Sequence, residues 1–390
     1  MTDAETGRSR IAWIRSRMPL LAQARTELAQ SQPFAGHRVG MSLHLEPKTA
    51  VLLQTLAAGG AEVVATGNFG STQDDVVAAL RADGMTVFGT RADDWDTHLG
   101  NVAAVIDAGP DILLDNGADL AAGAIDRKIT SDIIGGTEET TSGGFRLRED
   151  FAPQLPFPII VINDSLLKAI GENRHAVGQS VVESLMRLTN LMVNASHAVV
   201  LGYGWCGRGI AQYLRALGAQ VAVAEIDPIK AFEAALDGFR VAELNTLAPW
   251  ADLVITATGR AGVVDADTAA TMRPGTVLAN AGHFPTEIDV TGLRAAATAT
   301  TPMADSIEKL DYPGDHHLIL LAGGRMVNLA GRDPKGNSLE SMDLGFLLQT
   351  LSLERVATAP QTLTPGPQPV PLDIEQKIAR RFVRARDAAR

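Results

Sequence analysis

Residues 197–227, HAVVLGYGWCGRGIAQYLRALGAQVAVAEID, place an apolar run, a glycine-rich turn and an amphipathic segment in direct succession. The apolar run at residues 199–201 is typical of a buried strand, and from Ile210 onward apolar side chains recur at helical spacing. A second apolar run follows at residues 221–224. This order predicts a strand, a helix and a second strand, and the rest of the chain is organised around this βαβ unit.

The turn inside this unit carries the pattern G-x-G-x-x-G at Gly202, Gly204 and Gly207. The first glycine allows a tight turn, the second lets the backbone approach a pyrophosphate, and the third lets helix and strand pack closely. Glu225 ends the second strand, where a carboxylate accepts hydrogen bonds from both hydroxyls of an adenosine ribose and repels a 2′-phosphate. The sequence therefore predicts an NAD site, with the nearby Lys230 leaving NADP as the alternative.

The bulk composition is that of a globular protein with two or three domains. The chain has 390 residues and a formal net charge of −11 without a basic tract, which argues against nucleic acid or an anionic membrane as a partner. Its one cysteine, Cys206, cannot form a disulfide within the chain, so we expect a reducing, cytoplasmic location. The N-terminal residues lack the apolar core of a signal peptide, no membrane span is predicted, and no metal site is predicted.

Strand and helix patterns alternate along the chain on both sides of the βαβ unit. Strands are predicted at residues 39–45, 62–66, 86–88, 111–114, 132–135 and 159–162, and again at 253–257, 276–280 and 318–321. One helical pattern spans residues 8–30 with a bend at Pro19, and others span 48–58, 72–82 and 175–194. This alternation predicts an α/β fold with two doubly wound parallel-sheet domains.

The end of the chain has three different patterns. An amphipathic segment at residues 342–353 is expected to pack back on the first domain, which makes that domain discontinuous. Residues 359–372, APQTLTPGPQPVPL, have the composition of a proline-rich linker. A basic helix over residues 373–386 is expected either to dock on a neighbouring subunit or to be disordered. The predicted domains are residues 1–175, 176–335 and 336–358, with residues 359–390 as linker and C-terminal arm.

Polar residues gather where the strands of the first domain are predicted to end. They are His44, residues 68–74, residues 115–117, residues 138–141, and residues 163–165 with Lys168. A single cluster of this kind is typical of a helix cap. Five of them at successive strand ends predict a functional site, because ligands of parallel sheets bind beyond the carboxyl ends of the strands.

The motifs EETTSG at 138–143, NDSLLK at 163–168, GYGWCGRG at 202–209 and AGHF at 281–284 occur together in this chain. Their order and spacing over residues 35–355 closely resemble the S-adenosylhomocysteine hydrolase family. The resemblance implies a discontinuous substrate domain, a central Rossmann NAD domain, a small-molecule nucleoside substrate and a homo-oligomer, usually a tetramer. It also implies a reaction in which tightly held NAD oxidises the 3′-hydroxyl, a base removes the acidified C4′ proton, and the 5′ substituent leaves. Water then adds and the hydride returns, so the net reaction is hydrolysis.

The resemblance implies a role for individual residues. Lys168 assists deprotonation of the 3′-hydroxyl, Glu139 binds the ribose hydroxyls, His44 acts on the 5′ leaving group, and His283 lies over the sugar. The implied catalytic set also contains Asn116, Glu172 and Asn173, and the implied substrate contacts are Glu46, Lys48, Thr49 and Asn337. The resemblance further implies a set of residues that contact the cofactor. These are Thr140, Thr141, Ser142, Asn173, Gly202, Gly204, Trp205, Cys206, Gly207, Glu225, Ile226, Thr258, Gly259, Ala281, Gly282, His283 and Asn328.

Several positions depart from the family pattern. The family's LDDGGD is LDNGAD here, so Asn116 stands where the family has a catalytic aspartate, and an amide cannot accept a proton. Glu172 replaces a shorter aspartate, Glu46 and Lys48 stand where the family has threonine and glutamate, and Asn337 lies where the family has a glycine-histidine-proline loop. The usual C-terminal lysine and tyrosine are absent. Because the changes gather around the substrate pocket and C5′, we expect a substrate other than standard adenosylhomocysteine.

Three alternatives to a complete hydrolytic cycle stay open at this point. With Asn116 in place of an acid, the reaction could stop at the alkene, which describes a nucleoside 4′,5′-dehydratase of specialised metabolism. The chain could instead be a non-catalytic paralogue that binds NAD and a nucleoside and regulates a partner. A simple NAD dehydrogenase that releases a ketone is the third alternative, and net NADH production distinguishes it from the others.

Overall fold

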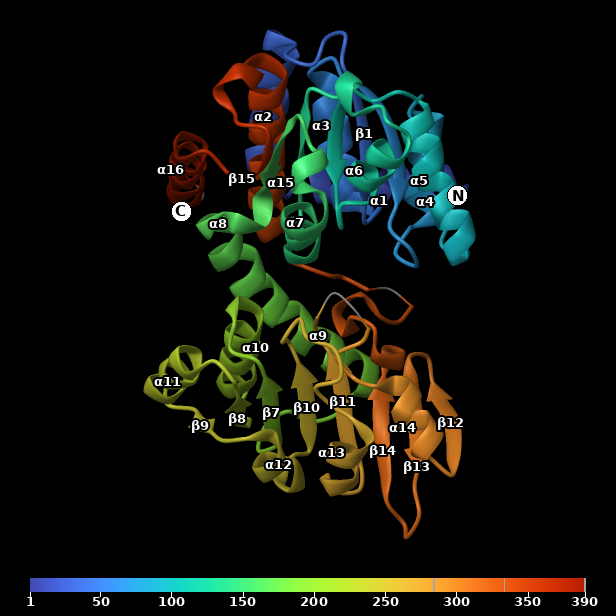
Figure 1. Cartoon of the computed structure of the whole chain (residues 1–390), viewed down its shortest axis with the longest axis vertical. Helices are drawn as coiled ribbons and strands as arrows, with labels where there is room; N and C mark the ends of the chain where they lie inside the picture. The colour runs from blue at the N-terminus through green and yellow to red at the C-terminus, as the bar shows by residue number, and fades with distance from the viewer. Residues whose placement is uncertain (283–284, 333, 389–390) are drawn as a thin grey trace. The chain divides into compact units, whose positions relative to one another are not determined.

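The structure, a computed structural model, describes residues 1–282, 285–332 and 334–388 (Figure 1). These residues form two units, each built on its own sheet. Unit 1 contains residues 1–169 and the chain from residue 339 to the C-terminus, and unit 2 contains residues 170–338.

Unit 1 is a seven-stranded parallel sheet, sheet A, covered by helices on both faces. Its strands are β1 (Arg38–Leu43), β2 (Glu62–Gly67), β3 (Thr86–Phe88), β4 (Ile112–Asp115), β5 (Gly135–Glu138), β6 (Pro158–Val161) and β15 (Gly366–Pro369). Its helices are α1 (Asp3–Arg15), α2 (Pro19–Ser31), α3 (Pro47–Ala58), α4 (Asp74–Ala82), α5 (Trp95–Asp107), α6 (Asp119–Asp126), α7 (Thr141–Arg146), α8 (Leu166–Lys168), α15 (Leu339–Thr358) and α16 (Leu372–Ala388). The strand order is β15-β6-β5-β4-β1-β2-β3, so the winding direction changes between β1 and β4.

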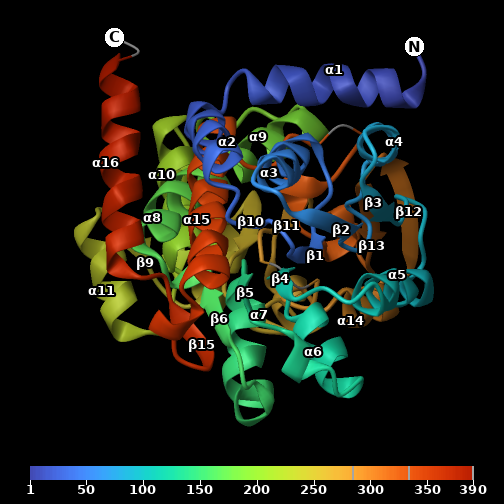
Figure 2. The same ribbon diagram turned by 90° about the horizontal axis from the view of Figure 1, so that it is seen from above.

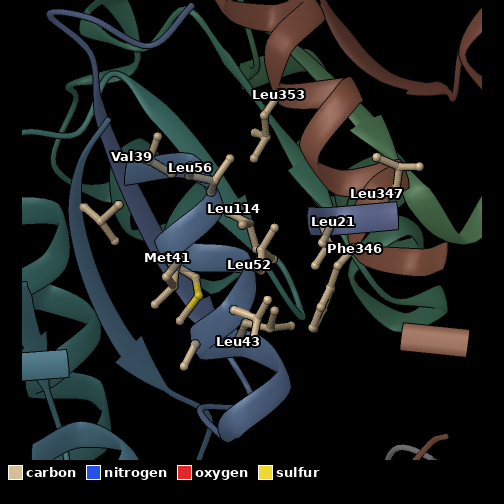
Figure 3. Close-up of a cluster of buried hydrophobic side chains, with 14 of the residues drawn as sticks. Leu21, Val39, Met41, Leu43, Leu52, Leu56, Leu114, Phe346, Leu347 and Leu353 are labelled. Carbon is tan, nitrogen blue, oxygen red and sulfur yellow. The ribbon is translucent and has the colours of Figure 1, made fainter. Parts of the chain in front are cut away.

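Side chains alternate between the two faces of sheet A, because successive residues of a strand point to opposite sides. In β4, Leu114 contributes to one buried cluster and Leu113 to another. Figure 3 shows the first cluster, in which Leu21 of α2, Leu52 of α3 and Phe346 of α15 lie in one apolar layer with Leu114. Segments from the two ends of the chain therefore share one core.

Unit 2 is an eight-stranded sheet, sheet B, with the order β12-β13-β14-β11-β10-β7-β8-β9. Its strands are β7 (His197–Leu201), β8 (Gln220–Ala224), β9 (Arg240–Val241), β10 (Leu253–Thr256), β11 (Thr276–Asn280), β12 (Ala299–Ala304), β13 (Ile307–Asp311) and β14 (His317–Leu321). Its helices are α9 (Val177–Thr189), α10 (Trp205–Ala216), α11 (Pro228–Leu236), α12 (Leu244–Leu247), α13 (Ala266–Thr271) and α14 (Val290–Ala296). In β7, Val200 packs toward the α9 and α10 side and Val199 toward the α12 to α14 side.

The α/β fold class with two doubly wound sheets is confirmed. Sheet B carries an addition that the sequence did not predict, because β12 and β13 form an antiparallel hairpin at its edge. Every residue of β12 is exposed, so the strand lacks the apolar alternation by which a strand is found in a sequence.

Some predicted boundaries were wrong. The pattern at residues 8–30 is two helices, since Pro19 begins α2 rather than bending one long helix. The strand predicted at 132–135 lies at Gly135–Glu138 instead, in glycine-rich sequence. A Cβ on Gly136 would lie 2.5 Å from the carbonyl oxygen of Leu113, so the close approach of β5 to β4 requires this glycine.

The stretch predicted as a proline-rich linker is part of the fold of unit 1. Gly366–Pro369 is the edge strand β15 and pairs in parallel with β6, a position that tolerates proline because one side of an edge strand needs no ladder hydrogen bonds. The basic helix α16 packs on its own chain, against α2 and α15 (Figure 2). Its Ile374 and Ile378 are buried, and Arg381 forms an ion pair of 2.7 Å with Glu27.

Candidate functional site

In unit 2, a cavity of about 400 Å³ lies at the carboxyl ends of β7, β8 and β10, where the winding direction of sheet B changes. A doubly wound sheet binds its ligand at this place. The lining residues are Gly202, Gly204, Ala224, Glu225, Ile226, Asp227, Lys230, Ala257, Thr258, Arg260 and Val263.

The three glycines of the turn meet different steric demands. Gly202 has a φ of +91°, and a Cβ there would lie 2.8 Å from the carbonyl oxygen of Ala257. A Cβ on Gly207 would lie 2.0 Å from the carbonyl oxygen of Gly202, so helix α10 can start here only with glycine. A Cβ on Gly204 would meet no described atom within 4 Å, and Gly204 lines the cavity. The backbone at Gly204 therefore carries no side chain at the place where a pyrophosphate would approach.

Gly204 is also the N-cap of α10, and among the residues that the structure describes no side-chain hydrogen bond caps that helix end. The N–H groups at the start of a helix and the helix dipole both favour an anion at such a place. Glu225 stabilises the same turn, since its carboxylate accepts hydrogen bonds from the N–H groups of Tyr203 at 2.6 Å and Ile226 at 2.8 Å.

The opposite rim of the cavity is held by Glu287, a residue that the sequence analysis did not select. This carboxylate is 1% exposed and accepts hydrogen bonds from the Thr258 N–H, the Thr258 hydroxyl and the Gly259 N–H at 2.7–2.9 Å. Asn280 fixes the next loop, because its Oδ1 accepts a hydrogen bond of 2.7 Å from the Gly282 N–H. The acid in the GHF-x-x-EID stretch was the available sequence signal for Glu287.

A chain of polar side chains runs through another part of unit 2. Asn328 donates to Ser180 Oγ at 3.2 Å, Ser180 contacts Asn337 Oδ1 at 3.2 Å, and Asn337 donates to Glu172 at 3.3 Å. The Oδ1 atom of Asn328 is buried without a hydrogen-bond partner among the described residues. The structure thus brings together three of the predicted residues, Glu172, Asn328 and Asn337, and the unpartnered acceptor suits the amide or hydroxyl donor of a ligand.

In unit 1, the predicted residues Lys168 and Glu139 form a buried ion pair. Their side chains are only 4% and 6% exposed. Gln349 of α15 donates to the other carboxylate oxygen of Glu139. Gln349 was not among the predicted site residues, although a glutamine among the buried apolar residues of α15 signals a polar site.

The neighbouring acid Glu138 is buried and belongs to the framework of the site. Its carboxylate accepts hydrogen bonds from the N–H groups of Gly117, Ala118 and Thr140 and from the Thr140 hydroxyl, at 2.7–3.2 Å. Burial raises the pKa of Glu138, and burial with the nearby Glu138 charge raises the pKa of Asp115 well above its usual range. Glu138 thus links the loops after β4 and β5.

The loop after β2 connects two other predicted residues. Nδ1 of His44 lies 2.8 Å from Ser71 Oγ, and Asn68 Nδ2 donates to Asn116 Oδ1 at 2.7 Å. At the start of α3, Lys48 lies 3.3 Å from Glu46, and the hydroxyl of Thr49 donates to the carbonyl oxygen of His44 at 2.6 Å. All of these contacts lie beyond the carboxyl ends of β1, β2 and β4.

Two family models match this chain. One, described as "S-adenosyl-L-homocysteine hydrolase, NAD binding domain", matches residues 173–333, and the other, "S-adenosyl-L-homocysteine hydrolase", matches residues 1–129. The S-inosyl-L-homocysteine hydrolase of Methanopyrus kandleri is 42% identical over 96% of this chain and 89% of its own length. The adenosylhomocysteinase of Sulfolobus acidocaldarius is 39% identical over 98% of this chain and 92% of its own length.

The chain belongs to the S-adenosyl-L-homocysteine hydrolase family. Its cofactor is NAD, and unit 2 contains the family's NAD-binding domain. Membership in this family supports an NAD-dependent enzyme of the hydrolase type. In the part of the chain that the structure describes, no helix is both long enough and apolar enough to span a bilayer.

Not all cofactor contacts implied by the hydrolase family line the cavity of unit 2. Gly202, Gly204, Glu225, Ile226 and Thr258 line it. Trp205, Cys206, Gly207 and Gly259 flank it in the chain, Ala281 and Gly282 follow β11, and Asn173 lies in the helical turn at Ala169–Ala176. Thr140, Thr141 and Ser142 belong to unit 1, where Thr140 caps α7. His283 lies outside the described residues.

Proposed function

We propose that this chain uses NAD to remove the 5′ substituent of a nucleoside by transient oxidation of the 3′-hydroxyl, with a nucleosidyl thioether of homocysteine as substrate. The observation that carries the proposal is the buried cluster of Lys168, Glu139 and Gln349 in a chain that also has a dinucleotide cavity. A sugar with two hydroxyls needs both a hydrogen-bond acceptor and a group that can take a proton, and Glu139, oriented by Gln349, and Lys168 would supply the two.

The residues of unit 2 fit NAD. Gly204 and the uncapped start of α10 would hold the pyrophosphate, Glu225 the adenosine ribose, and Asn328 has a buried acceptor to offer a ligand amide. When bound, NAD supplies the oxidant for the 3′-carbon and later returns the same hydride.

Lys168 and Glu139 would divide the work at the sugar hydroxyls. Glu139 is fixed by Gln349 and Lys168, so its carboxylate is oriented to accept hydrogen bonds. Lys168 would take the proton of the 3′-hydroxyl as the C3′–H bond breaks, which gives the ketone. The ketone acidifies the C4′ proton, and its removal expels the 5′ sulfur as a thiol once the sulfur is protonated.

At C5′, His44 is the group that can carry a proton, whereas Asn116 can only hydrogen-bond. His44 would take the C4′ proton and pass it to the leaving sulfur, and would then take a proton from the water that adds at C5′ of the alkene and return it to C4′. Reduction of the ketone completes a hydrolysis without net change of the cofactor.

A second candidate function is a nucleoside 4′,5′-dehydratase or related lyase that stops after elimination. The contact that favours it is the hydrogen bond between Asn68 and Asn116, in which both side chains are amides and neither can accept a proton from water. If His44 alone cannot drive the addition of water, the reaction consists of oxidation, elimination and reduction only. The product that is released is then the 4′,5′-alkene.

The test is to incubate the NAD-loaded protein with S-adenosyl-L-homocysteine, S-inosyl-L-homocysteine and nucleosides with other bases and 5′ groups. Absorbance of bound NADH and mass spectrometry of the products are followed together. We expect bound NADH to form transiently, and we expect free homocysteine and an intact nucleoside as the products. A product that lacks the elements of water supports the second function. Accumulation of free NADH would indicate a simple dehydrogenase. If NAD is bound but no compound yields NADH, the protein would be a regulatory paralogue. Either result would overturn the proposal.

A further inference from the structure

The loop of residues 68–73 is fixed against the segment that carries His44. The N–H of Asn68 donates to the carbonyl oxygen of Leu43 at 3.2 Å, and the N–H of Gln73 donates to that of Leu45 at 2.9 Å. The first bond continues the pairing of β1 with β2 beyond the ends of the strands, and the second holds the far end of the loop, where Gln73 is the N-cap of α4. A ring contact supports the loop from its outer side, because Phe69 meets Trp95 of α5 edge to face at 5.6 Å.

Within this frame, Ser71 makes two side-chain contacts with only one hydroxyl proton. Its Oγ donates to the carbonyl oxygen of Asn68 at 2.9 Å, and a carbonyl oxygen can only accept. The same Oγ lies 2.8 Å from Nδ1 of His44. Both hydrogen bonds exist together only if Nδ1 of His44 carries the proton and donates it to Ser71.

From this geometry we propose that Ser71 is a positioning residue that holds neutral His44 in its Nδ1–H tautomer, so that Nε2 is the nitrogen that exchanges a proton with the substrate. The inference deepens the proposed function, because it rests on His44 acting at C5′. A ring that flipped or changed tautomer would present an N–H where a proton must be taken up. A hydrogen bond to the other ring nitrogen is the usual way in which a protein prevents this.

The same loop also orients Asn116. Asn68 Nδ2 donates to Asn116 Oδ1, and the carbonyl group of Asn68 is the acceptor for both the N–H and the hydroxyl of Ser71. The loop thereby presents one proton-carrying group, His44, and one amide, Asn116, whose Nδ2 is left to donate. This division assigns all proton transfer around C5′ to His44.

The first test needs no activity. Long-range ¹H–¹⁵N correlation spectra of the NAD-loaded protein labelled with ¹⁵N-histidine report the tautomer of each imidazole, and the His44→Gln variant assigns the His44 signals. We expect the Nδ1–H tautomer for His44 in the native protein and in Ser71→Thr, which retains the hydroxyl. We expect a mixture of tautomers in Ser71→Ala. An Nε2–H tautomer of His44 in the native protein overturns the inference, whether or not the Ser71 variants fold.

The second test separates the steps of the reaction, with S-inosyl-L-homocysteine and S-adenosyl-L-homocysteine as probes. In Ser71→Ala we expect bound NADH to form at the native rate and release of homocysteine to fall about 10- to 100-fold, which is part of the roughly 10²–10⁴-fold that a positioned acid or base contributes. Ser71→Thr should restore release, and Ser131→Ala, an exposed serine of the same unit, should not change it. If the tautomer changes but release does not, the role of His44 in the proposed function fails while the tautomer assignment stands. Loss of NADH formation together with release would overturn the positioning role, since a general disturbance of the fold would then explain the variant.

Discussion

Sheet A and sheet B both have their candidate site residues beyond the carboxyl ends of their strands, but the two sites use different parts of the chain. In unit 2 the site is mainly backbone: a bare glycine turn, an uncapped helix end and a carboxylate that stabilises the turn. In unit 1 the candidate site consists of side chains from six segments far apart in sequence, namely those after β1, β2, β4, β5 and β6 and helix α15. It depends on buried charged groups such as Glu138 and the Lys168–Glu139 pair.

This difference explains what each site can tolerate. A backbone site is broken by added volume, because any Cβ at Gly202 or Gly207 collides with main-chain atoms. A side-chain site is broken by the loss of one partner, because a buried charge then remains without compensation.

The largest effect is expected when the ion pair of unit 1 is changed. Lys168→Ala should lower 3′-oxidation about 10³-fold or more, since a positioned proton acceptor typically contributes factors of 10²–10⁴. Lys168→Arg retains the charge beside Glu139 but cannot lose a proton at neutral pH, so it should fold and be nearly as inactive. NAD content should stay unchanged in both, because the cavity belongs to unit 2. The measurement is the rate at which bound NADH forms. Lys377→Ala, at an exposed lysine of the same unit, is the control. Normal oxidation in Lys168→Arg would refute the role assigned to Lys168.

The C-terminal helix provides a test of stability in unit 1. Ile378 is fully buried on α16, whereas Val383 on the same helix is 59% exposed. Ile378→Ala should lower the free energy of unfolding by about 2–4 kcal/mol, and Val383→Ala by at most about 0.5 kcal/mol. Urea unfolding followed by circular dichroism measures both. Equal effects of the two changes would mean that α16 does not belong to the core of its own chain.

The glycines of unit 2 give a matched pair of smaller effects. Gly207→Ala should destabilise unit 2 by about 1–3 kcal/mol, since the new methyl group meets the carbonyl oxygen of Gly202. Gly204→Ala should leave the apo protein as stable as the native one and weaken NAD binding about tenfold or more, because the methyl group extends toward the cavity. Thermal unfolding and NAD titration separate the two. Tight NAD binding in Gly204→Ala would show that the pyrophosphate does not approach this turn.

The last effect appears only when the pH is changed. Asp343 of α15 accepts hydrogen bonds of 2.8 Å from the N–H groups of Leu20 and Leu21, and burial raises its pKa to about 6. The folded state therefore holds this proton more tightly than the unfolded state does, and stability falls as pH rises from about 4 to about 6. The loss amounts to about 2–3 kcal/mol. Asp343→Asn should lack this loss, which urea titrations at several pH values can show.

The carboxyls of unit 2 provide the contrast for that titration. Backbone hydrogen bonds at helix starts lower the pKa of Asp227 and Asp265, so their contribution to stability is lost only as pH falls through their folded pKa values. Parallel stability curves for the native protein and Asp343→Asn would contradict the assignment for unit 1.

The sequence predicted the backbone site well and the side-chain site in part. The glycine turn and Glu225 could be found because a local pattern of 31 residues, 197–227, contains the strand, the turn and the helix start. The clusters after β1, β2, β4, β5 and β6 were found as strand ends, although which side chains meet there depends on tertiary contacts. Gln349, Ser71 and Glu287 were missed as partners for this reason.

The edge strands β12 and β15 also could not be predicted from local sequence patterns. The exposed strand β12 has no apolar alternation, and β15 has the composition of a linker because an edge strand tolerates Pro367 and Pro369. The pairing of β15 with β6 comes from the fold around it rather than from its own propensity.

The most direct measurement of the proposed chemistry is exchange at C4′. The NAD-loaded protein is incubated in D₂O with S-inosyl-L-homocysteine or S-adenosyl-L-homocysteine, and the recovered substrate and the nucleoside product are analysed by mass spectrometry and NMR. Oxidation at C3′ acidifies the C4′ proton, which a direct displacement at C5′ would leave in place, so we expect deuterium at C4′ in both, and none in Lys168→Arg. Product formation without deuterium at C4′ would mean that the 5′ substituent leaves by direct displacement, and would contradict a role for NAD in the reaction.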